Sequence, residues 1–292
     1  MVTSARGMKV FKNNPHIAEL VKHNEEVEIH KLSDEISRLQ KKYKCDKVLD
    51  LSESVEVALS LHPRSPEYKM SKPEKLAKFN RNFYEYSFEF SKEVGDDYIP
   101  ELFFSDSEIE EAVKYVPQDK FTILLGMSGS GNNKAYPYND QLAEAICSEF
   151  PEAHIITVGD EKCQLIEPQI EGRITNISGK IDMRTSMALT GLVDLVIAPD
   201  TGIIHASGCY DTPKICLLGH NTIECITKHF VNDYSLEADR KLAPCAPCLS
   251  LIYDIKLQCP IDNTTGGVMC MSKGLPVVSI MNQVRKVYNA KS

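Results

Sequence analysis

The amino-acid sequence predicts an α/β protein built around a parallel β-sheet. In the second two-thirds of the chain, short apolar runs typical of buried strands alternate with segments of helical periodicity, and the intervening loops are short. Such alternation predicts a parallel sheet that is covered by helices on both faces. The apolar runs that we interpret as strands are KFTILLG, HIITVG, RITNIS, DLVIAPD and KICLLG.

The first third of the chain shows the same alternation in weaker form. VEIHKL at 27–32 and DKVLDLS at 46–52 have the composition of strands, and a helical stripe begins after Ser33, which we predict to cap that helix. We therefore expect strand–helix–strand units here as well.

Two further helices are predicted before the central strands. Aromatic residues at spacings of three and four follow Ser71 and predict one long helix that ends near Gly95. Ser105 and Glu108 have the spacing of a capping box and start a second helix.

The polar stretch PQDK suggests a domain boundary near residue 118. We predict an N-terminal domain over 1–118 and a C-terminal domain over 119–292, whose last helix covers about 277–289.

Composition excludes several functional classes. The 292 residues are 42% hydrophobic and 25% charged, and their net charge of -8 argues against a general nucleic-acid binder. No apolar run is long enough to span a bilayer, and the first residues lack the apolar region of a secretory signal. We therefore expect a cytoplasmic protein with reduced cysteines.

Three polar loops follow predicted strands and therefore lie at one edge of the sheet, where ligands of parallel sheets bind. GMSGSGNNK follows Leu125, GDEK follows Val158 and PDTG follows Ala198. The glycine-rich first loop lacks both the Lys-Ser/Thr ending of a P-loop and the spacing of a dinucleotide-binding motif.

The PDTG loop has the chemistry of a phosphate site. A helix N-terminus presents unpaired N–H groups and a partial positive charge, which together attract anions. Gly202 lets a ligand approach the backbone, Thr201 adds a hydroxyl, and Lys134 supplies a positive charge for a diphosphate. The simpler alternative is that Asp200 and Thr201 only cap the helix and that His205 only packs.

These motifs together resemble glycosyltransferase family 9, which includes the bacterial ADP-heptose:lipopolysaccharide heptosyltransferases. The resemblance is carried by SGSGNNKAYP, by VDLVIAPDTGIIHASGCYDTPKICLLG and by the cysteine-bearing tail, and more weakly by FKNNPHI and YKCDKVLDLSES. It implies a GT-B fold, in which two Rossmann-like domains face each other across a cleft. It also implies an inverting transfer that needs no divalent metal, because backbone N–H groups and a basic side chain stabilise the leaving diphosphate.

The resemblance further implies a donor, an acceptor and a set of donor-binding residues. The donor is a nucleotide-diphosphate sugar, with an ADP-sugar such as ADP-heptose favoured. The acceptor is a glycan or a lipopolysaccharide-type lipid, which implies peripheral contact with a membrane. Asp160 or Glu161 is expected to hold the ribose hydroxyls. The full set of predicted donor-binding residues is Ser128, Lys134, Asp160, Glu161, Asp200, Thr201, Gly202 and His205.

The N-terminal part departs from the family pattern. Family members begin with a strand and a loop whose aspartate is the expected catalytic base, whereas MKVFKNNPHI matches a point well inside the acceptor domain. We therefore expect an incomplete N-terminal Rossmann-like domain, an unidentified base, and an exposed sheet edge that favours a homodimer. The alternatives are a non-catalytic nucleotide-sugar binding module, a truncated inactive homologue, and a non-catalytic α/β interaction protein.

The C-terminal tail contains four spaced cysteines. Cys245 and Cys248 form a C-x2-C pair, and Cys259 and Cys270 follow at intervals of ten residues. Four thiolates are a typical ligand set for structural zinc, so we predict a zinc site here. Reduced structural cysteines, or one or two disulfides, are the alternatives.

Overall fold

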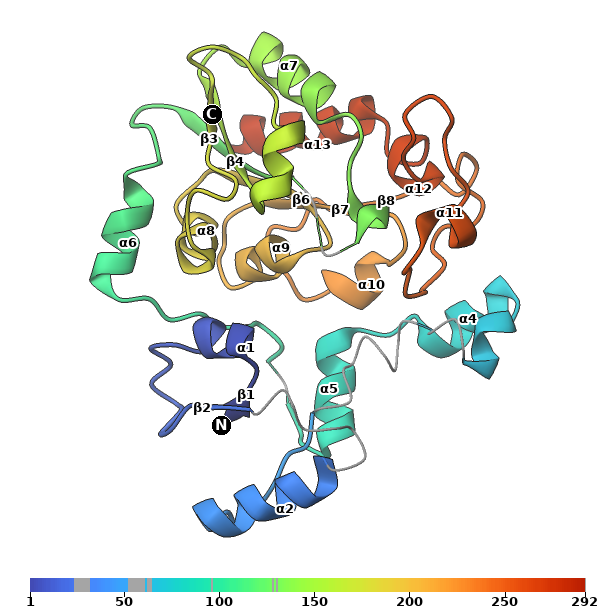
Figure 1. The fold of residues 1–292 in the computed structure, drawn as a ribbon. Coiled ribbons are helices and arrows are strands. Elements are labelled where there is room, and N and C mark those ends of the chain that lie inside the picture. Colours follow the sequence, from blue (N-terminus) through green and yellow to red (C-terminus); the bar gives the residue numbers. More distant parts are fainter. Residues whose placement is uncertain are drawn as a thin grey trace.

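The centre of the molecule is a six-stranded parallel sheet, shown in the computed structural model of Figure 1. Its strand order is β5-β4-β3-β6-β7-β8, the order of a doubly wound nucleotide-binding domain that begins at β3. This confirms the predicted α/β class and parallel sheet. The structure describes residues 1–23, 32–51, 61, 65–95, 97–127, 129 and 131–291. The six strands are β3 (Phe121–Gly126), β4 (Ala153–Val158), β5 (Ile174–Asn176), β6 (Leu195–Pro199), β7 (Lys214–Leu218) and β8 (Leu236–Glu237).

Helices cover both faces of this sheet, which is why its strands are continuous apolar runs rather than alternating ones. Ile123 and Leu125 on β3 belong to the apolar layer under α7 and α13, whereas Leu124 belongs to the layer under α8, α9 and α10. Figure 1 shows the two helix groups on opposite sides of the strands. Their bounds are α7 (Asn139–Glu149), α8 (Met183–Leu189), α9 (Gly202–Ser207), α10 (Ile223–Ile226) and α13 (Val277–Lys291).

The sequence predicted five of the six strands of this sheet and the C-terminal helix. It missed β8, because a two-residue strand leaves no periodic pattern. The helix expected after β4 is a 3-10 helix. The other short elements here are η3 (Asn132–Lys134), η4 (Glu161–Ile166), α11 (Ile255–Gln258) and α12 (Met269–Ser272). Across the described ranges, every helix is too short or too polar to cross a membrane.

The N-terminal part is mainly helical where it is described. Its only described strands, β1 and β2, form a two-stranded parallel pair. Its elements are β1 (Val2–Thr3), α1 (Ala5–Val10), β2 (Val21–Lys22), α2 (Leu32–Tyr43), η2 (Pro66–Lys69), α4 (Lys72–Phe79), α5 (Phe83–Ser91) and α6 (Asp106–Val113). In Figure 1 this part lies beside the six-stranded sheet, and its last helix, α6, leads into β3.

The strands predicted in this part are not found where they can be checked. Residues 46–51 form no regular element, and the side chains of Val48, Leu49 and Leu51 are exposed. The strand prediction is wrong there, because no sheet among the described residues is covered by these apolar side chains. Ser33 lies inside α2 rather than at its cap. Of the strand predicted over 27–32, Leu32 is the first residue of α2, and 27–31 lie outside the described residues.

The long aromatic helix is two helices, α4 and α5, with a break at Asn82. The buried Asn82 side chain caps α5, and its Nδ2 donates to the carbonyls of Glu224 and Cys225 at 3.2 and 3.4 Å. A contact with α10 therefore breaks the helix that the spacing predicts. The helix ends at Ser91 rather than near Gly95, because the next residue adopts a left-handed conformation.

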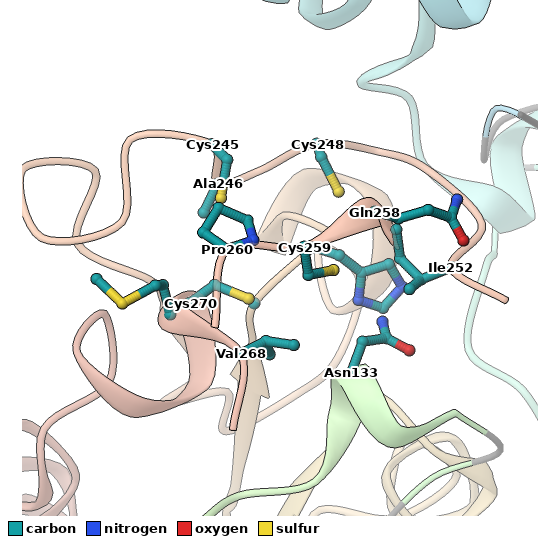
Figure 2. A pocket seen from close by; sticks show the side chains of 13 residues that line it. Asn133, Cys245, Ala246, Cys248, Ile252, Gln258, Cys259, Pro260, Val268 and Cys270 are labelled. Carbon is teal, nitrogen blue, oxygen red and sulfur yellow. The ribbon is translucent and has the colours of Figure 1, made fainter. Parts of the chain in front are cut away.

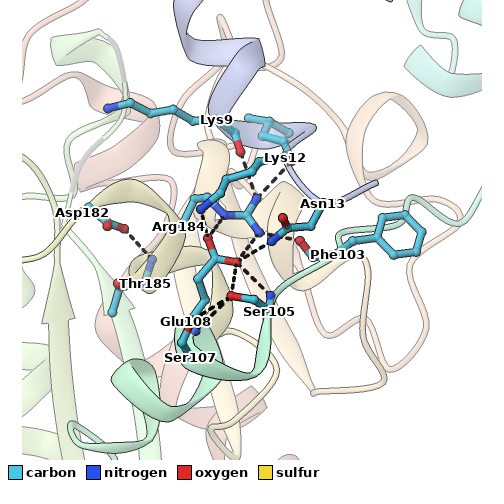
Figure 3. Close-up of polar contacts among 11 residues, drawn as sticks. Lys9, Lys12, Asn13, Phe103, Ser105, Ser107, Glu108, Asp182, Arg184 and Thr185 are labelled. Carbon is cyan, nitrogen blue, oxygen red and sulfur yellow. Dashed lines mark hydrogen bonds and ion pairs between the residues drawn. The ribbon is translucent and has the colours of Figure 1, made fainter. Parts of the chain in front are cut away.

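A partly buried ion pair ties the N-terminal part to the six-stranded domain, and Figure 3 shows its contacts. Glu108, which forms the predicted capping box with Ser105, accepts from Arg184 Nε at 2.6 Å and from Lys12 Nζ at 3.0 Å. Arg184 also donates to the Lys9 carbonyl at 2.9 Å. Hydrogen bonding from Arg184 outweighs burial and holds the pKa of Glu108 well below its ordinary range. We call this group the Arg184 cluster.

Candidate functional site

Asp200 lies directly after β6 and collects three side chains at the carboxyl edge of the sheet. Its Oδ2 accepts from Lys134 Nζ at 3.1 Å and from Asn221 Nδ2 at 3.0 Å, and its Oδ1 lies 3.2 Å from His205 Nε2. Lys134 follows β3 and Asn221 follows β7, so the cluster straddles the point between β3 and β6 where the strand order reverses. We call it the Asp200 cluster.

The carboxyl group of Asp200 is nearly buried, with 6% of the residue exposed. Burial alone would raise its pKa, but the hydrogen bond from His205 and the charge of Lys134 outweigh burial and hold the pKa well below its ordinary range. Asp200 is therefore an anion that fixes Lys134 and His205 in place.

The side chains of Asp200 and Thr201 do not cap helix α9. Thr201 stands at the N-cap position without a side-chain capping bond, and its buried Oγ1 has no partner among the described residues. A Cβ atom built on Gly202 would meet no heavy atom within 4 Å, so the backbone at the start of α9 faces open space. The simple capping alternative does not describe these residues.

Gly129 lets the loop after β3 pack against this edge. A Cβ atom at Gly129 would lie 2.8 Å from Lys134 Cδ and 3.0 Å from Thr201 Cγ2, so a side chain there would displace one of them. Ser128, which we predicted to bind the donor, lies outside the described residues.

A pocket of about 180 Å³ opens beside the cluster, and we call it the Asp200 pocket. Lys134 and Asp200 form one side of it, and the loop that follows the cysteine pair forms the other. The lining residues are Gly131, Asn133, Lys134, Asp200, His220, Asn221, Ser250, Leu251, Ile252 and Tyr253.

Two residues after β7, the largely buried His220 and the buried Asn221, complete the polar wall of the pocket. Burial lowers the pKa of His220 to about 4, so this ring is neutral near pH 7 although its Nε2 lies 3.8 Å from Asp200 Oδ2. Asn221 is 3% exposed, and its Oδ1 has no partner in the described part of the chain. Neither residue was predicted from the sequence. The signal was available, because HN directly follows the strand KICLLG at the predicted ligand edge.

The N-terminal part contacts the Asp200 cluster through Tyr84 on α5. The Tyr84 hydroxyl lies 3.4 Å from His205 Nδ1, so the imidazole is placed between Asp200 and this phenol. Burial raises the pKa of Tyr84 well above its ordinary value, and the hydroxyl stays protonated. The aromatic pattern of this helix did not single out Tyr84.

Asp160 and Glu161 are not among the residues that line the Asp200 pocket. Asp160 caps η4, since its Oδ1 accepts from the backbone N–H groups of Lys162 and Cys163 at 3.1 and 3.2 Å. Their contact with a ribose stays a prediction.

The four tail cysteines lie around a second, smaller pocket of about 40 Å³, the cysteine pocket, shown in Figure 2. Burial raises the pKa of Cys259 to about 11 and that of Cys270 to about 12, and no disulfide joins the described cysteines. As the side chains stand, the described residues contain no group of three or more His, Cys, Asp or Glu that could hold a metal ion. Cys245 and Cys248 are the other two cysteines that line this pocket.

The two pockets share part of their lining. Asn133, His220 and Ile252 line both the Asp200 pocket and the cysteine pocket. The loop that carries the cysteine pair is also tied to the N-terminal part, because the backbone of Leu61 bonds with Leu249 and Leu251.

Comparison with known proteins identifies the family and the fold. The model of glycosyltransferase family 9 (heptosyltransferase) matches residues 55–246. A family 9 glycosyltransferase from Veillonella parvula DSM 2008 has a similar structure, with a TM-score of 0.67 and 12% identity over 99% of this chain and 87% of that chain. No curated protein matches the sequence.

Two Escherichia coli structures are also similar. ADP-heptose LPS heptosyltransferase II matches with a TM-score of 0.50 and 12% identity, over 69% of this chain and 57% of that chain. The iron-containing dodecameric glycosyltransferase TibC, from enterotoxigenic strain H10407, matches with a TM-score of 0.52 and 11% identity, over 72% and 54%. The chain thus spans little more than half the length of these two proteins, and the likeness shows a shared fold.

Proposed function

Because the chain belongs to glycosyltransferase family 9, we propose that it transfers a sugar from a nucleotide-diphosphate donor to a glycan or lipopolysaccharide-type acceptor. The observation that carries this proposal is the Asp200 pocket. It lies at the reversal point of a doubly wound sheet, where nucleotides bind in such folds, and it is lined by the largely buried cation Lys134.

Lys134 is the group best suited to hold the diphosphate. Its ammonium has three N–H donors and gives one to Asp200, which leaves the others for phosphate oxygens. Because its side chain is only 15% exposed, this charge acts with less screening than a surface lysine would have. The hydroxyl of Thr201, which has no partner among the described residues, and the backbone N–H of Gly202, beside which there is open space, would supply further donors.

We propose an inverting single displacement. The acceptor hydroxyl attacks the anomeric carbon of the sugar, the bond from that carbon to the diphosphate breaks, and the electron pair leaves with the nucleoside diphosphate. Lys134 and the Thr201–Gly202 backbone would stabilise the developing phosphate charge, which is how a site without a divalent metal promotes this step. The base that removes the hydroxyl proton comes from the acceptor side, and no residue is assigned to it.

We favour an ADP-sugar, and heptose within that class, because one of the similar E. coli structures is that of ADP-heptose LPS heptosyltransferase II. Titration calorimetry of the whole chain with ADP, UDP and GDP tests the proposal. We expect one nucleoside diphosphate to bind, and absence of binding at millimolar concentration of all three would overturn the proposal.

Catalysis needs a separate assay. Release of ADP from ADP-heptose in the presence of a lipopolysaccharide-type acceptor would establish transfer. Tight donor binding without turnover would favour the alternative of a non-catalytic nucleotide-sugar binding module. We expect the activity in the cytoplasmic fraction, with weak membrane association at the acceptor, and fractionation of cells checks this location.

For the tail we propose a structural zinc ion in the cysteine pocket. The support is that four cysteines distant in sequence line one small pocket. As they stand, the thiols do not meet the geometry of a metal-ligand set, so the side chains would have to turn toward the centre of the pocket. Elemental analysis of freshly purified, reduced protein should find one zinc per chain, and a metal content far below one would contradict the proposal.

A further inference from the structure

Asn221 has one end of its side-chain amide fixed and the other end free. Its Nδ2 donates to Asp200 Oδ2 at 3.0 Å, and an ionised carboxylate can only accept hydrogen bonds. The NH2 group must therefore face Asp200. This sets the position of the carbonyl oxygen, Oδ1, which is buried and has no partner within the described ranges.

A buried carbonyl oxygen without a hydrogen bond destabilises the folded protein. Asn221 lines the Asp200 pocket, so a bound molecule can supply the missing donor. Phosphate oxygens cannot do so, because they are acceptors themselves. The group that meets Oδ1 must instead carry an O–H or N–H.

The strand order indicates which part of a nucleotide sugar reaches Asn221. The predicted ribose contacts, Asp160 and Glu161, follow β4, whereas Asn221 follows β7. In the order β4-β3-β6-β7, the proposed diphosphate site at β3 and β6 lies between them. A donor with its diphosphate at Lys134 and its ribose toward β4 therefore points its sugar toward β7.

We propose that Asn221 is a specificity residue whose Oδ1 accepts a hydrogen bond from a hydroxyl group of the transferred sugar. This inference rests on the proposed function. It assigns to Asn221 a contact with the sugar rather than with the nucleotide, and Asp200 sets the orientation of the amide that makes it.

Calorimetry on Asn221→Ala with two ligands tests this assignment. We expect the variant to bind ADP-heptose about 5- to 10-fold more weakly than the wild type, the usual effect of one lost hydrogen bond, and to bind ADP within twofold. If ADP loses as much affinity as ADP-heptose, Asn221 only supports Asp200 or contacts the ribose, and the inference is wrong. Asn221→Thr keeps a hydroxyl that can donate to Asp200 and serves in place of Asn221→Ala if that variant folds poorly.

Deoxy analogues of the sugar make the test sharper. One of the monodeoxy donors should bind the wild type about 5- to 10-fold more weakly than ADP-heptose does. Asn221→Ala should bind that same analogue no more weakly than it binds ADP-heptose. Effects that simply add for every analogue would overturn the direct contact. Absence of any nucleotide binding by the wild type would instead overturn the proposed function, so the two failures are distinguishable.

Discussion

Asp200 and Glu108 are both carboxylates that gather hydrogen-bond donors from segments far apart in the sequence. The Arg184 cluster is closed, because the N–H groups of Arg184 donate hydrogen bonds to Glu108 and to backbone carbonyls. The Asp200 cluster borders a pocket and leaves Asn221 Oδ1 without a partner in the described part of the chain. The comparison teaches that a buried charge by itself indicates structure, whereas an unused polar group on a residue that lines a pocket indicates a ligand.

The largest expected effect is on stability, from Arg184→Ala. Its removal leaves Glu108 partly buried without its main partner and leaves backbone carbonyls unpaired, so the free energy of unfolding should fall by about 3–5 kcal/mol. Urea denaturation measures this loss. Arg38→Ala is the matched control, because Arg38 forms an exposed pair with Glu35 and its removal should cost less than about 1 kcal/mol. Equal losses in the two variants would remove the special role of the Arg184 cluster.

The next effect is on binding, from Lys134→Ala. The variant should bind the nucleoside diphosphate about 10- to 100-fold more weakly, because a charge-assisted hydrogen bond is lost from a shielded site. Asp200 keeps its contacts with Asn221 and His205, so we expect the variant to fold. Lys241→Ala changes an exposed lysine and should leave affinity unaltered. Unchanged affinity in Lys134→Ala would exclude Lys134 from the site.

Lowering the pH should weaken the Arg184 cluster of the wild type, and Glu108→Gln should abolish this pH dependence. The folded-state pKa of Glu108 is lowered, so its stabilising effect is complete above the unfolded-state pKa of about 4.3 and is lost as the pH falls below it. The stability difference between the wild type and Glu108→Gln should therefore be constant from pH 7 to 5 and smaller at pH 3. Urea midpoints at the three pH values measure it, and a difference at pH 3 as large as that at pH 7 would contradict the assignment.

The smallest effect concerns a single hydroxyl group. Thr201→Val removes an oxygen that has no described partner, so stability should change by less than about 1 kcal/mol while nucleotide affinity falls about 3- to 10-fold. Thr122→Val is the opposite case, because the Thr122 hydroxyl donates to Asp194 at 3.0 Å. That variant should lose stability and keep its affinity. The reverse pattern would mean that Thr201 is purely structural.

The fold of the six-stranded domain could be predicted from the sequence better than that of the N-terminal part, and the reason is physical. Strands buried on both faces appear as uninterrupted apolar runs, and five of them could be located directly. In the N-terminal part, the break at Asn82 depends on carbonyls of α10, more than a hundred residues away. No local pattern contains that information.

The candidate site could also be predicted only in part. Lys134, Asp200 and His205 could be placed together, because loops that follow parallel strands meet at one edge. The sequence did not show that Asp200 binds side chains instead of capping α9, because either use suits an aspartate at that position. The place of Asn221 at this edge could have been predicted, because it closely follows the strand KICLLG, but the orientation of its amide is defined only by the contact with Asp200.

The lining that the two pockets share gives them a route for thermodynamic coupling. Asn133, His220 and Ile252 line both the Asp200 pocket and the cysteine pocket. An occupant of one pocket that shifts these side chains would change the affinity of the other pocket for its own ligand. Such coupling is reciprocal, so the factor by which an occupant of the cysteine pocket alters nucleotide affinity is the factor by which the nucleotide alters retention of that occupant.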